Sequence, residues 1–74
     1  MYQSRMEEIE LTVNGQARRV PGGCTVRQLL EILALDAARV AVERNLDVVP
    51  RRVYAETRLA AGDSVEIVTL VGGG

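Results

Sequence analysis

The sequence contains no histidine, lysine, tryptophan or phenylalanine, and it has a single cysteine, Cys24. Without histidine, the chain lacks the side chain that most often moves protons near neutral pH and most often binds transition metals. One cysteine cannot form an internal disulfide, which argues against a small secreted fold held by cross-links. Any catalytic site would depend on carboxylates, hydroxyls, two tyrosines and one thiol. We therefore expect no intrinsic catalytic residues and no metal site.

Charge and hydrophobic runs exclude further classes. Nine arginines face ten acidic residues, so the net charge is −1, which gives no strong attraction to nucleic acid or to an anionic membrane. No apolar run approaches the roughly 20 residues of a membrane span, and no signal peptide is recognisable. We expect a cytoplasmic protein. Its 74 residues have room for one domain.

The first half of the chain predicts a hairpin. Ile9–Val13 alternates apolar and polar residues, as a half-buried strand does. Asn14-Gly15 is the strongest two-residue hairpin signal, and a second strand is expected over Gln16–Val20. Residues 1–8 carry no pattern, so we expect a frayed extension, followed by a domain over residues 9–71 and a flexible glycine tail over residues 72–74.

A helix follows the hairpin. Thr25 and Gln28 fit a capping box, in which each side chain bonds the other residue's backbone N–H. The residues after Thr25 place an apolar stripe at helical spacing, made of Val26, Leu29, Leu30 and Leu33. We expect the helix to end between Ala34 and Asp36.

The second half predicts short elements. In order, these are a strand over Val40–Arg44, an extended segment at Val48-Val49, a helical turn near residues 53–55 and a last strand over Ser64–Val71. A hairpin followed by a crossover helix predicts a mixed sheet with that helix packed on one face. A right-handed crossover would place the last strand parallel to the first. This α+β arrangement is the β-grasp, or ubiquitin-like, fold.

The last strand offers a candidate docking surface. If Val65 and Ile67 face the helix, Val68 and Leu70 stand on the open face of the sheet. The alternative, that Val68 and Leu70 complete the edge of the core, remains open at this point. Val71 and Arg51 are further candidates for partner contact.

The chain ends in Gly72-Gly73-Gly74. Glycine has no Cβ, so such a tail can pass through a slot too narrow for other residues and present its carboxylate to another enzyme. The simpler alternative is a frayed terminus.

Several motifs in order resemble the ThiS-type sulfur carrier proteins of thiamine biosynthesis, ubiquitin-like proteins that end in Gly-Gly. The resemblance covers residues 9–74. It rests on Val13-Asn14-Gly15, Thr25-Val26 with Leu29-Leu30, Val40 to Asn45, Val49-Pro50-Arg51, Tyr54 to Thr57, Leu59, Gly62-Asp63, Val65 to Val68 and the closing glycines. Leu46 departs from the family pattern, because a small turn residue is more usual there.

The resemblance implies a protein cosubstrate, with no cofactor bound to the carrier itself. An activating enzyme would use ATP to adenylate the carboxylate of Gly74, and a sulfur donor protein would then supply the sulfur of a C-terminal thiocarboxylate. Thiazole synthase would consume that sulfur. In this reading Gly72 and Gly73 form the threading tail, and Val68, Leu70, Val71 and Arg51 contact partners.

Three alternatives remain at this stage. The small subunit of molybdopterin synthase is another thiocarboxylate carrier with this fold and terminus. A ubiquitin-like modifier would form isopeptide links to target lysines. A binding module without chemistry would not use its glycines at all.

Two further features have structural explanations. Cys24 precedes the helix cap, where an apolar residue packs on Leu29, so we favour a structural thiol over a sulfur relay. Gly22-Gly23 lacks the lysine and further glycines of a phosphate loop and is interpreted as a turn.

Overall fold

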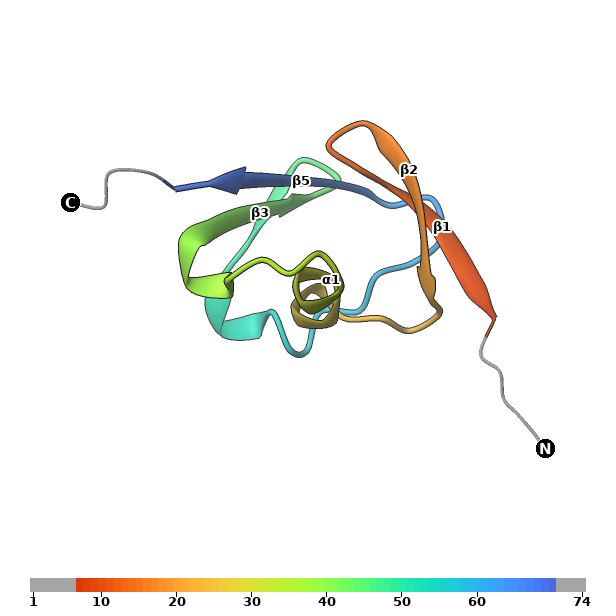
Figure 1. The fold of residues 1–74 in the computed structure, drawn as a ribbon, viewed down its shortest axis with the longest axis horizontal. Coiled ribbons are helices and arrows are strands. Elements are labelled where there is room, and N and C mark those ends of the chain that lie inside the picture. The colour runs from red at the N-terminus through yellow and green to blue at the C-terminus, as the bar shows by residue number, and fades with distance from the viewer. Residues whose placement is uncertain (1–6, 71–74) are drawn as a thin grey trace.

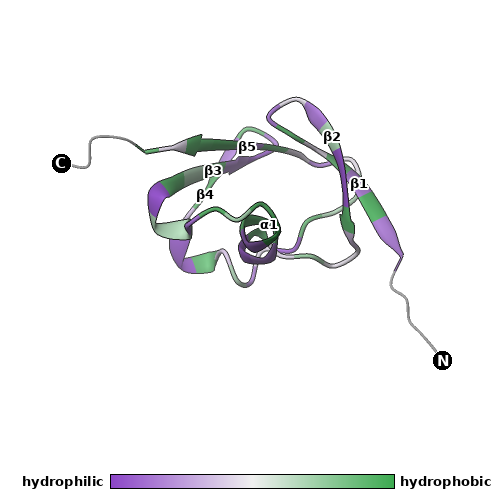
Figure 2. Cartoon of the chain, viewed as in Figure 1, coloured by the Kyte–Doolittle hydropathy of each residue, from purple (hydrophilic) through white to green (hydrophobic). Residues whose placement is uncertain are grey.

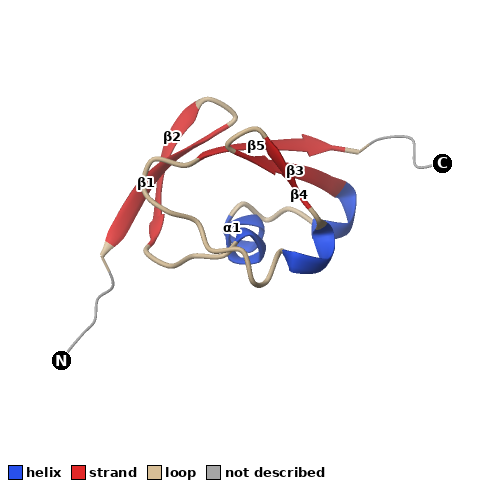
Figure 3. Cartoon of the chain, turned by 180° about the vertical axis from the view of Figure 1, so that it is seen from behind, coloured by secondary structure: helices blue, strands red, loops and turns tan. Residues whose placement is uncertain are grey.

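The computed structural model describes residues 7–70 and contains a five-stranded mixed sheet with one α-helix against one face. In chain order the elements are β1 (Glu8–Val13), β2 (Gln16–Pro21), α1 (Val26–Ile32), the 3-10 helix η1 (Ala37–Arg39), β3 (Val40–Arg44), β4 (Asp47–Val49), the 3-10 helix η2 (Arg51–Val53) and β5 (Ser64–Thr69). Figure 1 shows the sheet as one layer with α1 beneath it. Seen from behind in Figure 3, all helical segments lie on that same side. The predicted β-grasp fold is confirmed.

The strand order is β2-β1-β5-β3-β4, which places the first and last strands side by side in the middle of the sheet. β1 and β5 are parallel, as predicted, but pair only through Thr12 with Ser64 and Val13 with Val65. Beyond that point β1 turns away into its antiparallel hairpin with β2. On its other side β5 pairs antiparallel with all five residues of β3, through Val65 to Thr69.

The core lies between the sheet and α1. Residues of α1 and of the inward face of each strand are almost fully buried, and Val26, Leu29 and Val65 have no measurable exposure. Figure 2 shows apolar stretches along β5, whose apolar residues are Val65, Ile67 and Val68. The buried apolar set is Leu11, Val13, Val20, Cys24, Val26, Leu29, Leu30, Val40, Val42, Val49, Tyr54, Leu59, Val65 and Ile67.

The capping box at Thr25 is present, but α1 ends at Ile32, earlier than the predicted Ala34–Asp36. Ala34 has φ +60°, and its N–H donates to Glu31 at 3.0 Å, while Leu35 N–H donates to Leu30 at 2.9 Å. This pair of bonds is a Schellman motif, which normally carries glycine at the left-handed position. Because alanine stands there, the end of the helix carries no recognisable stop signal.

Smaller differences concern the other element bounds. β1 begins at Glu8, one residue before the predicted start, and β5 ends at Thr69. The predicted helical turn lies at Arg51–Val53, two residues earlier than expected. η1 was not predicted; the carboxylate of Asp36 caps it by accepting from Ala38 N at 2.9 Å. Within residues 7–70, no helix has the length and apolar character that crossing a membrane requires.

Candidate functional site

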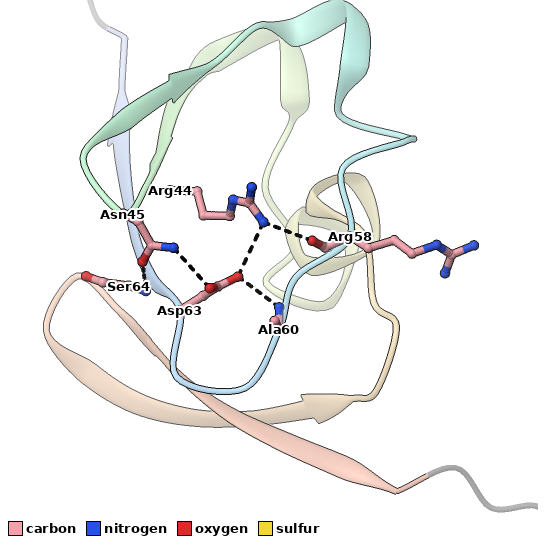
Figure 4. Close-up of polar contacts among 6 residues, drawn as sticks. All are labelled: Arg44, Asn45, Arg58, Ala60, Asp63 and Ser64. Carbon is pink, nitrogen blue, oxygen red and sulfur yellow. Dashed lines mark hydrogen bonds and ion pairs between the residues drawn. The ribbon is translucent and has the colours of Figure 1, made fainter.

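The candidate site is the C-terminal end of β5, and its geometry depends on how firmly that strand is held. Asp63, which is 8% exposed, anchors the start of β5 (Figure 4). Its carboxylate accepts from Ala60 N at 2.8 Å and from Asn45 Nδ2 at 3.0 Å, and it lies 3.6 Å from Arg44 NH1. Asn45 Oδ1 in turn accepts from Ser64 N at 2.9 Å. The strand therefore begins from a fixed point.

The middle of β5 is held by a side chain. Asn14 Oδ1 accepts from Ile67 N at 2.7 Å, and Asn14 Nδ2 donates to Ile67 O at 3.1 Å. Asn14 N also donates to Val65 O at 2.8 Å. These bonds lie beyond the last residue pair between β1 and β5, so the Asn14 side chain supplies the hydrogen bonds that a neighbouring strand would otherwise make. The sequence indicates Asn14 as a turn residue only; this second role depends on a contact between residues 53 positions apart.

The last described residue, Leu70, is bonded to the segment that precedes β3: its N–H donates to Arg39 O at 2.8 Å. That segment is itself fixed by Arg51, whose Nε donates to Ala37 O at 3.0 Å and whose NH2 donates to Val40 O at 3.4 Å. Arg51 thus helps to hold the chain beside the exit of β5. Its contact with a partner stays a prediction.

Side chains of β5 divide between two faces. Val65 and Ile67 are buried against the helix side, with exposures of 0% and 8%. Val68 and Leu70 are exposed by 60% and 49% and stand on the open face. The interpretation in which they complete the core edge is therefore wrong. Their contact with a partner remains a prediction.

The remaining predicted site residues, Val71, Gly72, Gly73 and Gly74, lie outside the residues that the structure describes. What the structure supplies is the base from which they start. β5 is held at Asp63, at Ile67 and at Leu70, so the last described residue has a defined position at the end of the strand (Figure 1).

Cys24 is 3% exposed and lies in the core beside the cap of α1, with its Sγ 3.4 Å from Thr25 O. Loss of solvation raises the pKa of the thiol, so it stays protonated at neutral pH. Both observations favour the structural role predicted for it. Among residues 7–70, no cluster of three or more acidic, histidine or cysteine side chains could hold a metal ion.

Gly22 and Gly23 form a plain turn, closed by Cys24 N donating to Pro21 O at 3.1 Å. Gly23 has φ +81°, and a Cβ on Gly22 would meet the carbonyl oxygen of Glu7 at 2.8 Å. Backbone geometry therefore accounts for both glycines.

Comparison with known proteins gives a consistent result. The sequence model of the ThiS family matches residues 11–74. The sulfur carrier protein ThiS of Escherichia coli is 32% identical over 89% of this chain and over its own full length. A thiazole synthase of Paramagnetospirillum magneticum is 44% identical over 89% of this chain, which spans only 20% of that protein. The crystal structure of a thiamine biosynthesis protein, ThiS, from Geobacter metallireducens superimposes with a TM-score of 0.75 at 38% identity, covering 89% of this chain and all of the other.

Proposed function

Because this chain belongs to the ThiS family, we propose that it is a sulfur carrier for thiazole formation in thiamine biosynthesis, with Gly74 as the group that carries the sulfur. The observation that supports this proposal is that β5 is anchored as far as Leu70, with Val68 and Leu70 exposed at its end. A carrier needs this presentation because the chemistry is done by its partners. The chain is then a cosubstrate and not an enzyme.

The proposed chemistry has two steps. A free carboxylate is a poor electrophile, so an activating enzyme first lets the Gly74 oxygen attack the α-phosphorus of ATP, with pyrophosphate as the leaving group. Sulfur from a donor protein then attacks the acyl carbon, and AMP leaves. If that sulfur arrives as a persulfide, a second thiol opens the acyl disulfide and is itself oxidised to a disulfide, which releases the thiocarboxylate. We assign this cycle to the cytoplasm because it consumes ATP.

The partners follow from this cycle. We propose that Val68 and Leu70, with Val71 next in the chain, dock on the activating enzyme while Gly72 and Gly73 thread toward its nucleotide. Arg51 would contact the same partner at the exit of β5. The likeness to a segment of a thiazole synthase supports that enzyme as the acceptor of the sulfur.

Intact-protein mass spectrometry tests the proposal. The chain is incubated with ATP, the activating enzyme and a sulfur donor, and we expect the mass shift of one oxygen replaced by one sulfur at the C-terminus. Gly73→Val should abolish the shift, because a β-branched side chain does not fit a channel built for glycine. One alanine appended after Gly74 should abolish it as well.

Both variants alter residues beyond β5, so circular dichroism should show a native fold. Thiocarboxylate formation on the extended chain would contradict the role of Gly74. Normal sulfur transfer by Gly73→Val would contradict threading. Isopeptide-linked adducts in place of a thiocarboxylate would favour a protein modifier.

A further inference from the structure

The open side of the sheet carries a surface of which the proposed function uses only Val68. It consists of Ala41, Glu43, Val48, Glu66 and Val68, and we call it the β3–β5 face. Strand register places these residues together: Glu43 lies opposite Glu66 on β5 and opposite Val48 on β4, and Ala41 lies opposite Val68. Directly opposed residues point to the same side of a sheet. The residues between them, such as Val42 and Ile67, are buried on the other side.

The centre of this face is a like-charge pair. Directly opposed side chains have Cβ atoms roughly 4.5–5.5 Å apart, and like charges at that spacing destabilise a sheet. Within residues 7–70, neither Glu43 nor Glu66 forms an ion pair with any arginine. By contrast, the exposed acids of β1 do have a counter-ion, because Arg19 on β2 lies within 4 Å of both Glu8 and Glu10. The fold therefore leaves two adjacent negative charges without a counter-ion.

Apolar side chains frame the pair. Val48 is 70% exposed and lies beside Glu43 on β4. Val68 is 60% exposed and follows Glu66 two residues along β5, opposite Ala41, which is also exposed. A surface with two acceptors at its centre and methyl groups around them matches one kind of side chain well. Arginine has an apolar stem and a planar guanidinium whose five N–H donors can bond two carboxylates at once.

We propose that the β3–β5 face receives an arginine side chain of the activating enzyme, with its guanidinium between Glu43 and Glu66 and its stem against Val48 and Val68. This inference rests on the proposed function, because it describes how the same partner is recognised. It adds the chemistry of the partner: the surface of the activating enzyme that packs on Val68 contains a basic residue. It also places recognition about two residue pairs along the sheet from the exit of the tail, so docking and threading use separate contacts.

The test is calorimetric titration of the activating enzyme with the full chain, as wild type and as Glu43→Gln/Glu66→Gln. Glutamine keeps the shape of glutamate and removes the charge. We expect binding to weaken by about tenfold or more, since truncating one side of a buried charge pair commonly costs at least that much. The loss should shrink at high salt, where the wild-type attraction is screened. The melting temperature should be unchanged or higher, because the repulsion is gone.

A matched control separates local recognition from overall charge. Glu31→Gln/Glu56→Gln changes the net charge equally, on exposed residues of the helix side, and should bind within about twofold of wild type. Equal weakening of both double variants would overturn the proposal in favour of long-range attraction. Wild-type affinity, or a lowered melting temperature, for Glu43→Gln/Glu66→Gln would also overturn it. In those cases, thiocarboxylate formation by the wild type would still support the carrier function. The carrier function itself would be contradicted by a wild type that is never converted to the thiocarboxylate.

Discussion

The side-chain amide of Asn14 pairs with the backbone of Ile67 as a neighbouring strand would, accepting from Ile67 N at 2.7 Å and donating to Ile67 O at 3.1 Å. The same residue has φ +51° in the turn between β1 and β2. Asparagine suits both tasks, because it tolerates the left-handed region and its amide has a donor and an acceptor. One residue thus shapes the first hairpin and fixes the last strand, from which the functional tail departs.

Replacing Asn14 with glycine should separate these two tasks. Glycine keeps the turn conformation but removes both bonds to Ile67, so we expect a loss of about 1–3 kcal/mol in the free energy of unfolding. Urea denaturation measures that loss. Hydrogen exchange at the Ile67 amide should accelerate more than exchange at Val42, which lies opposite it on β3. An unchanged unfolding free energy would mean that water replaces the amide at no cost.

The second hairpin offers a gain in stability. Asn45 and Leu46 have φ +53° and +74°, close to the +51° and +83° of Asn14 and Gly15. Leucine is strained in that conformation and is 86% exposed, so its side chain contributes little packing. We expect Leu46→Gly to stabilise the protein by about 0.5–1 kcal/mol in urea denaturation.

Leu46→Ala is the matched control for this change. It removes most of the side chain but keeps the Cβ that causes the strain, so its stability should stay near that of the wild type. A gain of the same size for alanine would show that exposed leucine, and not the backbone, is responsible.

The fold could be predicted because its local signals agree with one another. The alternation in Ile9–Val13, the Asn14-Gly15 turn and the capping box at Thr25 each appear where the sequence placed them. The end of α1 could not be predicted, because the residue there adopts a conformation that its residue type does not indicate. Ala34 ends α1 in a position usual for glycine, and no sequence pattern distinguishes it from an ordinary helical alanine.

The site could be predicted in part. Alternation along β5 separated Val65 and Ile67 from Val68 and Leu70, but only the register of the sheet decided which pair is exposed. The bonds from Asn14 to Ile67 join residues 53 positions apart and follow from tertiary structure alone. The pairing of Glu43 with Glu66 likewise depends on how β3 meets β5.

The core can be tested on α1. Leu30 is 1% exposed, whereas Ile32 on the same helix is 49% exposed. We expect Leu30→Ala to cost about 2–5 kcal/mol, through lost burial and the cavity left behind, and to unfold much of so small a domain. Ile32→Ala should change the melting temperature far less. Equal effects of the two substitutions would show that the helix packs through a different face.

Because of Cys24, we expect the free energy of unfolding to vary with pH in the alkaline range. Burial raises the pKa of its thiol in the folded state above the ordinary value of 9.0, so the folded chain holds this proton when the unfolded chain has lost it. The stabilisation is fully present below about pH 9 and is lost as the pH rises through the folded pKa. We expect the free energy of unfolding to fall less steeply above that pH in Cys24→Ala than in the wild type. Parallel curves would show that the thiol is accessible to solvent.

The last prediction concerns docking through Val68 and Leu70. Both side chains stand on the open face, so Val68→Ser/Leu70→Ser removes little core burial and should leave a native circular dichroism spectrum. It strips apolar contact from the surface next to the tail, and truncated interface anchors typically cost about 2 kcal/mol or more, a loss of roughly thirtyfold in affinity. Titration of the activating enzyme measures this loss. Ile32→Ser/Leu46→Ser makes the same kind of change at two exposed residues away from Val68 and Leu70, so it should bind as the wild type does. Wild-type affinity for Val68→Ser/Leu70→Ser would show that these two side chains take no part in docking.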